Sequence, residues 1–416
     1  MSAETVTIER LGSGGDGIAV GPGGPLYVPF TLPGETVAIA RVKNHGTVMS
    51  TAIASPERVV PPCRHFGPDG KNGTCGGCSL QHASDTLYHA YKRELVVEAL
   101  KMKGLTPTVA PLVIARPGER QRLVFTARRT EKALLLGFNQ PSSHHIVDIE
   151  ECPIGSPGIV SRLEAIRAIA AALATDSQSF RVTVLETLSG LDLAFEGVQK
   201  IGDRQRRAVT ECVLSLRGIA RVSHDGEILI EPQKPQIAFG GVLVSPPPGG
   251  FTQATKEAEE AMAALVLDHI GKAKRVADLF SGSGTFALRI ASIARTHAVE
   301  GDEKALKALD HAARHAQGLK QVSVEKRDLF RRPLMATELK VFDAVVFDPP
   351  RAGAEEQCRE LARSGVKKIA AVSCNPVTLA RDLSILVAGG YRITAVTPID
   401  QFLWSSHVEA VATLEK

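Results

Sequence analysis

Short runs of alternating apolar and polar residues fill the first part of the chain. The segments VTIERL, GIAVG, LYVPF, TVAIARV and GTVMSTAIA have this pattern, and glycine- or proline-containing turns such as GSGGDG and TLPGE separate them. Alternation with a period of two is typical of half-buried strands, and several short strands at regular spacing favour a small barrel. We therefore expect an OB-like β-barrel over residues 1–58, followed by the proline-broken linker SPERVVPPC.

A second pattern covers the middle of the chain. A helical stretch is predicted from about Leu87 to Lys103, and strands are predicted for LVFTARR, ALLLGFN, RVTVLET, LDLAFEG and EILIEP. The segment SPPPGG at residues 245–250 breaks regular structure and marks a boundary. These features predict a central α+β domain over residues 59–245.

Strands and helices alternate from about residue 270 to the end. KRVADLF, RTHAVE, QVSVEK, FDAVVFD, KKIAAVS, YRITAVTPID and VEAVATL have strand character, and helical stretches such as EKALKALDHAARHA lie between most of them. Such alternation predicts a mostly parallel α/β sheet that binds ligands at the carboxyl ends of its strands. We expect a Rossmann-like domain over residues 246–416.

Composition excludes some classes of protein. With 416 residues, 44% hydrophobic and 23% charged, the chain fits a globular protein of two or three domains. The sequence has no 18-residue apolar run, and its start, MSAETVTIER, lacks secretory-signal features, so we expect a cytoplasmic protein without a membrane span. The net charge of +4 does not identify a nucleic-acid binder. Between Tyr91 and Lys132 there are ten Lys/Arg and four Asp/Glu. The basic residues could contact phosphates, or they could form solvated faces of helices and strands.

A glycine-rich turn in VADLFSGSGTFAL, residues 276–288, predicts a cofactor site. An apolar strand is expected to end at Asp278. Gly282 and Gly284 then form the turn, and a helix is expected to begin near Thr285. The next strand ends at Glu300, where a carboxylate commonly holds ribose hydroxyls. Nucleotide oxidoreductases use a related turn, and a turn without a ligand is a further alternative. The missing third glycine, which serves a pyrophosphate, favours S-adenosylmethionine.

Two acidic residues and one cysteine also follow predicted strands. Asp328 in VEKRDLF could face an adenine or cap a helix, and Asp348 lies in the rigid segment FDPPRAG, where we favour a functional role. Cys374 in KKIAAVSCNPVTLARDL lies between an apolar strand and a helix. The positive end of a helix dipole lowers the pKa of a nearby thiol, so we expect a nucleophile rather than a buried structural cysteine.

Six segments together resemble the RNA uracil-C5-methyltransferases, which make 5-methyluridine. They are FTQAT (251–255), DLFSGSGTF (278–286), AVEGD (298–302), FDPPRAG (347–353), SCNPVTLARDL (373–383) and HVEAVATL (407–414). The resemblance implies that Cys374 adds covalently to carbon 6 of uracil and that Glu409 is the general base. It also implies a set of contacts to S-adenosylmethionine: Gln253, Phe280, Thr285, Glu300, Asp328 and Asp348. The amino-terminal barrel resembles the TRAM domain of many members.

An early cysteine cluster adds a second candidate site. Cys63, Cys75 and Cys78 follow a C-x11-C-x2-C spacing, and Cys152 lies in EECPIG. Four cysteines could hold zinc, but only one C-x2-C pair is present, and a closing Cys-Pro is typical of iron–sulfur ligation. HFG, CGGCSLQH and EECPI resemble the segment that holds a 4Fe-4S cluster in the ribosomal-RNA members. Cys212 and Cys358 are expected to be packing residues.

These observations lead to one expected function and two alternatives. We expect uridine-C5 methylation of RNA, with 23S ribosomal RNA as substrate and with an RNA-binding surface on the central domain. In the family, the helical stretch near residues 87–110 packs on the catalytic domain. The same chemistry on transfer RNA is the first alternative, and a non-catalytic RNA-binding or assembly protein is the second. A monomer is favoured.

Overall fold

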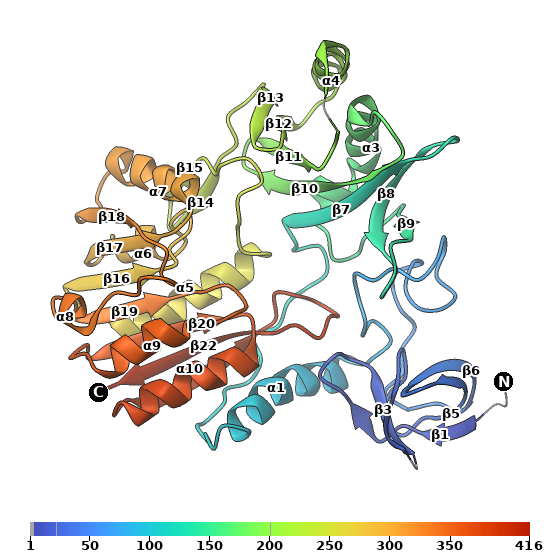
Figure 1. Cartoon of the computed structure of the whole chain (residues 1–416), viewed down its shortest axis with the longest axis horizontal. Coiled ribbons are helices and arrows are strands. Elements are labelled where there is room, and N and C mark those ends of the chain that lie inside the picture. The colour runs from blue at the N-terminus through green and yellow to red at the C-terminus, as the bar shows by residue number, and fades with distance from the viewer. Residues whose placement is uncertain (1–3, 22, 200) are drawn as a thin grey trace.

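The computed structural model describes residues 4–21, 23–199 and 201–416. These residues form four sheets, of six, seven, two and seven strands, with helices packed on the larger two (Figure 1). No helix in the described part of the chain combines the length and the hydrophobicity needed to cross a membrane.

The amino-terminal sheet is built from the expected short strands and one more. Its strands are β1 (Glu4–Thr7), β2 (Arg10–Leu11), β3 (Gly17–Gly21), β4 (Gly24–Val28), β5 (Thr36–Val42) and β6 (His45–Ile53). They lie in the order β1-β5-β6-β4-β3-β2, and the inward side chains Leu26, Val28, Val37 and Ile39 have no exposed surface. This apolar core explains why the alternating segments fold together.

Helix α1 (Asp85–Lys101) connects this sheet to the carboxyl-terminal part of the chain. Ser84 caps its first turn by accepting a hydrogen bond from the backbone N–H of Leu87. The Tyr91 hydroxyl donates to the carbonyl of Gly12, whereas Val96 and the residues of the last turns enter the core beneath α10 and β21. After α1 the chain runs along the outer edge of β21, where Val109 and Val113 form bridges with Val396 and Ile399.

The central sheet is mixed and has the order β13-β12-β11-β10-β7-β8-β9. Its strands are β7 (Arg122–Arg129), β8 (Leu134–Asn139), β9 (Ile146–Asp148), β10 (Ser179–Thr187), β11 (Gly190–Glu196), β12 (Ile219–His224) and β13 (Glu227–Ile230). Its helices are α2 (Pro157–Val160), α3 (Leu163–Leu173) and α4 (Asp203–Ser215). Apolar side chains of α3 and α4 pack on one face of the sheet, and a small hairpin, β14 (Ile237–Phe239) and β15 (Val242–Val244), follows it.

The last sheet has the order β18-β17-β16-β19-β20-β22-β21 and is parallel except at β22. Its strands are β16 (Arg275–Leu279), β17 (Arg295–Glu300), β18 (Val322–Lys326), β19 (Ala344–Phe347), β20 (Lys368–Ser373), β21 (Arg392–Ile399) and β22 (Glu409–Glu415). Its helices are α5 (Lys256–Ile270), α6 (Ala287–Ile290), α7 (Glu303–His315), α8 (Ala336–Leu339), α9 (Glu355–Ala362) and α10 (Pro376–Ala388). Apolar cores lie on both faces of this sheet, as expected for the α/β class.

The helix that follows the glycine-rich turn is short. The helix expected near Thr285 begins at Ala287 and has only four residues, because the backbone is still turning at Gly284, whose φ is +106°. A Cβ at Gly284 would also lie 3.0 Å from the Leu288 side chain, so only glycine fits this close approach.

Candidate active site

Three of the predicted functional residues lie at one end of the carboxyl-terminal sheet. Asp348 directly follows β19, Cys374 directly follows β20, and Glu409 begins β22. Because β20 and β22 are antiparallel and Ser373 pairs with Ala410, the next positions along the two strands are Cys374 and Glu409. The topology therefore brings a thiol and two carboxyl groups to one edge.

A chain of amide hydrogen bonds joins the two carboxyl groups. Gln253 donates from Nε2 to Asp348 Oδ2 over 2.8 Å, and its Oε1 accepts from Gln401 Nε2 over 3.0 Å. Gln401 Nε2 also donates to Glu409 Oε2 over 2.5 Å. Residues from four separate segments are thus fixed relative to one another.

Both carboxyl groups have raised pKa values. Burial raises the pKa of Glu409, the nearby Asp348 carboxylate raises it further, and the hydrogen bond from Gln401 opposes the shift. Burial likewise raises the pKa of Asp348, against the hydrogen bond from Gln253. Glu409 Oε1 has no hydrogen-bond partner among the described residues, which leaves it available to a ligand.

The Cys374 thiol differs from the sequence-based expectation. Burial raises its pKa to about 11, the charges of Glu409 and Asp348 act in the same direction, and only Arg351 opposes them among the nearby charged groups. The expected thiolate is therefore wrong for the RNA-free protein, because burial and two acidic neighbours outweigh the helix dipole. The thiol is protonated at neutral pH.

The loop after Asp348 is tied to the start of α10. Asn375 caps the helix by accepting from Val377 N–H, and its side-chain amide donates to the carbonyl of Arg351. The Arg351 guanidinium lies 3.1 Å from His407 Nδ1. Burial and the nearby arginine and lysine charges lower the pKa of His407, so its ring is neutral at pH 7. These contacts hold the rim of the site in one arrangement.

The glycine-rich turn has the shape of a ligand cradle. Gly282 has φ +53°, and a Cβ there would meet no atom within 4 Å, so open space lies beside its backbone. Glu300 Oε2 accepts from Gly282 N–H over 2.9 Å, and Glu300 Oε1 accepts from Asp302 N–H over 2.7 Å. Phe280 also has a positive φ of +61°, a strained conformation for a residue with a side chain.

Unpartnered polar atoms lie beneath this turn. Both carboxyl oxygens of Asp278 and the hydroxyls of Ser281 and Ser283 are buried and lack hydrogen-bond partners among the described residues. Burial raises the pKa of Asp278 far above its usual range, and the charges of Asp348 and Glu300 contribute. Buried polar atoms without partners are costly in a protein, so this group fits a site that is completed by a polar ligand.

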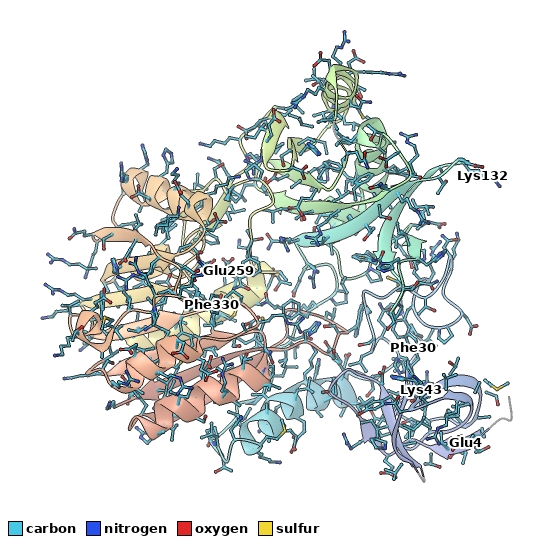
Figure 2. The ribbon with its side chains drawn as sticks, viewed as in Figure 1. Glu4, Phe30, Lys43, Lys132, Glu259 and Phe330 are labelled. Atoms are coloured by element: carbon cyan, nitrogen blue, oxygen red, sulfur yellow. The ribbon has the colours of Figure 1, made fainter. Side chains whose placement is uncertain are left out.

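The remaining predicted cofactor residues, Asp328 and Thr285, are not part of the hydrogen bonds described above. Asp328 is exposed, and its Oδ1 accepts from the backbone N–H of Phe330 over 3.0 Å, so its carboxyl caps a turn. Phe330, which is labelled in Figure 2, is half exposed, and its ring centre lies 5.5 Å from that of Phe280. Thr285 is partly buried in the glycine-rich segment, and its carbonyl accepts from Arg289.

The four early cysteines gather at a second place. Cys63, Cys75, Cys78 and Cys152 all line one small, largely apolar cavity. Burial raises the pKa of Cys75 to about 11 and that of Cys152 to about 12. Within the described residues no group of three or more His, Cys, Asp or Glu has the arrangement of a metal-ion site.

Sequence reasoning assigned no role to two residues of the site. Gln401 bonds to both Gln253 and Glu409, although it lies in the loop between β21 and β22 with no motif to mark it. Asp278 was placed at the end of its strand without a role. Its position after an apolar run and before the glycine turn was the signal that it would be buried beside the ligand.

Comparison with known proteins agrees with this geometry. A family model described as tRNA (uracil-5-)-methyltransferase matches residues 245–416. An uncharacterized RNA methyltransferase of Rhizobium meliloti is 73% identical over 416 residues, which is all of both chains. The 23S rRNA (uracil(1939)-C(5))-methyltransferase RlmD of Hahella chejuensis is 31% identical over 447 residues, covering 99% of this chain and 97% of that protein.

A solved structure shows the same fold. The Pyrococcus abyssi tRNA (uracil-54, C5)-methyltransferase in complex with S-adenosyl-L-homocysteine has a TM-score of 0.74, with 24% sequence identity and 99% of each chain covered. The fold, the family match and the full-length relatives agree with one another. The chain therefore belongs to the RNA uracil-C5-methyltransferase family and is an S-adenosylmethionine-dependent RNA methyltransferase.

Proposed function

We propose that this chain methylates carbon 5 of a uridine in ribosomal RNA through a covalent adduct on Cys374. The observation that carries the proposal is the pairing of β20 with β22, which brings Cys374 beside Glu409 and close to Asp348. The full-length similarity to a 23S rRNA enzyme, at 31% identity, supports the ribosomal substrate, whereas the transfer-RNA enzyme of the same fold is 24% identical.

The residues present fit S-adenosylmethionine at the glycine-rich turn. Glu300 supplies a carboxylate for ribose hydroxyls, the open backbone at Gly282 leaves room, and the unpartnered atoms of Asp278, Ser281 and Ser283 require a polar ligand. The cofactor, when bound, supplies the methyl group. Asp348 accepts a hydrogen bond from Gln253, and its charge acts both on Asp278 in the strand before this turn and on Cys374.

The proposed steps of the reaction can be assigned to side chains of this site. The Cys374 thiol loses its proton to solvent, and its sulfur bonds to carbon 6 of uracil, which moves an electron pair toward carbon 5. Carbon 5 then accepts the methyl group. Glu409 Oε1 takes the proton from carbon 5, the carbon 5–carbon 6 double bond re-forms, and the sulfur leaves. The target nucleotide must be unstacked from its neighbours to reach these groups.

Trapping with 5-fluorouridine RNA tests this function. Fluorine replaces the proton that Glu409 removes, so the adduct should persist after methyl transfer and survive denaturing electrophoresis. Mass spectrometry should locate it on Cys374, and Cys374→Ala should form none. A non-catalytic RNA-binding protein would give no adduct with the natural chain. Mapping 5-methyluridine in ribosomal and transfer RNA from cells that lack the protein separates the two substrates.

We also propose that the four-cysteine cavity holds an iron–sulfur cluster. Only one C-x2-C pair is present, and the fourth cysteine, Cys152, is followed by proline, which is typical of iron–sulfur ligation rather than of a structural zinc site. Cys63, Cys75, Cys78 and Cys152 would be its ligands, and the cavity that they share supports this assignment. The cluster would hold together segments that are distant in sequence and take no part in methyl transfer.

The same proposal extends to the organisation of the chain. We assign residues 1–58 to a TRAM-like RNA-binding barrel, residues 59–245 to a cluster-bearing central part and residues 246–416 to the methyltransferase. The curled six-stranded sheet, in which β1 also contacts β3, supports the first assignment.

A further inference from the structure

Gln401 lies at the centre of the hydrogen bonds that define the active site. Its side chain is almost completely buried, with 2% of its surface exposed. Its Oε1 accepts from Ala254 N–H over 3.0 Å. A backbone N–H can only donate, so this contact fixes the orientation of the amide and directs Nε2 toward Glu409 and Gln253.

The two oxygens of Glu409 consequently have different surroundings. Oε2 accepts the hydrogen bond from Gln401, whereas Oε1 is buried without a partner among the described residues. A carboxyl group could rotate and exchange its two oxygens, and the Gln401 contact opposes that rotation. One oxygen is therefore held, and the other stays free to accept a proton.

The loop that carries Gln401 is itself anchored on helix α1. The neighbouring Asp400 accepts from Lys92 Nζ over 3.1 Å and from the Tyr88 hydroxyl over 2.6 Å. Lys92 also donates to the carbonyl of Phe402 over 3.1 Å. These contacts flank Gln401 on both sides in sequence, so its amide is presented from a rigid loop.

We propose that Gln401 is the positioning residue of Glu409. Its amide holds the Glu409 carboxyl group so that Oε1 stays free to face carbon 5 of the uracil. This inference rests on the proposed role of Glu409 as general base. Gln401 does not touch the reacting atoms in the proposal and acts only through Glu409 and Gln253.

The charged groups around Glu409 define the expected effect of losing Gln401. Asp348, from the end of β19, disfavours a negative charge on Glu409, whereas the hydrogen bond from Gln401 favours it. The Arg351 charge acts on the neighbouring Cys374, whose thiol is protonated at neutral pH. His407 is neutral. Without the Gln401 donor, burial and Asp348 would act unopposed, so the pKa of Glu409 would rise further.

The experiment compares single-turnover methylation of natural RNA by the wild type and Gln401→Leu. Formation and decay of the covalent adduct are followed separately as a function of pH. We expect the adduct still to form. The affinity for S-adenosylmethionine is measured alongside, because Gln401 also bonds to Gln253 on the cofactor side. We expect decay to slow about tenfold at pH 7 and to recover at higher pH, because a lost hydrogen bond to a charged group corresponds to about one pH unit or more.

Two further variants keep the test decisive. Gln401→Glu preserves the shape of the side chain but replaces the donor with a carboxyl group, so the decay profile should move in the same direction. Gln357 is an equally buried glutamine that bonds only to the backbone of Leu334, away from the site. Gln357→Leu should lower stability without moving the pH profile.

The outcomes separate this inference from the proposed function. A wild-type decay profile in both Gln401 variants would overturn the positioning role, provided that Glu409→Gln accumulates adduct. If Glu409→Gln decays normally, the proposed base is wrong and the inference fails with it. An equal shift in Gln357→Leu would also overturn the inference, because the effect would then be general loss of packing.

Discussion

The Lys92 ammonium lies 3.1 Å from the Asp400 carboxylate, and neither side chain has any exposed surface. The two residues are more than 300 positions apart in the chain and join α1 to the loop that precedes Glu409. A buried ion pair of this kind contributes little net stability by itself, but removing one partner leaves the other charge buried and unpaired. The pair thus makes the active-site loop depend on a helix outside the family-matched segment.

Lys92→Met should therefore destabilise the protein severely. We expect a loss of about 3–5 kcal/mol in the free energy of unfolding, measured by urea denaturation. Lys101→Met, on the exposed end of the same helix, should leave the free energy of unfolding close to that of the wild type. Equal stability losses in the two variants would contradict the buried anchor.

Alkylation of Cys374 should have an unusual pH dependence. Burial and the acidic neighbours raise the pKa of its thiol to about 11, and only the thiolate reacts with iodoacetamide. The labelling rate of the RNA-free protein should rise about tenfold per pH unit between pH 7 and 10, as followed by peptide mass spectrometry. Cys374→Ala identifies the peptide, and a rate that levels off near pH 7 would refute the raised pKa.

Cofactor affinity should depend on the Glu300 carboxylate. Glu300→Ala removes the proposed ribose acceptor and the contact to Gly282, so we expect S-adenosylmethionine to bind about 10- to 100-fold more weakly by calorimetry. Glu303 lies three residues away on the surface and pairs with Lys307 and Lys326. Glu303→Ala should bind S-adenosylmethionine as tightly as the wild type. An equal loss of affinity in Glu303→Ala would contradict the assignment of Glu300 as the ribose acceptor.

Measuring the iron content tests whether the four cysteines hold a cluster, independently of catalysis. Protein purified without oxygen should contain iron and acid-labile sulfide and absorb visible light, and Cys152→Ser should lose all three signals. Cys212→Ser is the matched control, because Cys212 lies on α4 and outside that cavity. Iron-free wild-type protein after reconstitution with iron and sulfide would contradict the cluster.

The sequence predicted the elements of the carboxyl-terminal sheet well. KKIAAVS contains β20, because a strand that is buried on both faces and begins with charged residues has a clear apolar signal. The edge that carries Asp348 and Cys374 also followed from strand order, since side chains after parallel strands meet at one edge. Glu409 was identified only through the family resemblance, because it begins a strand that runs antiparallel to β20. Which atoms the cofactor and RNA contact stays a prediction.

Other features depend on contacts that no local pattern encodes. Gln401 bonds to Gln253 across 148 positions, and neither residue has a local signal for the partner. The pKa of Cys374 was mispredicted because the helix terminus is visible in the sequence, whereas burial and the charge of Glu409 arise only after folding. The sequence likewise did not predict how short α6 is, because the positive φ of Gly284 is seen only in the folded chain.

The bridges of Val109 and Val113 along β21 have a consequence for shortened forms of this protein. They cover the outermost strand of the α/β sheet, with Val113 N–H donating to the Pro398 carbonyl. A fragment that starts at residue 245 would expose that strand, and bare edge strands recruit other chains and aggregate. The segment that the family model matches is therefore shorter than the segment that keeps this edge strand covered.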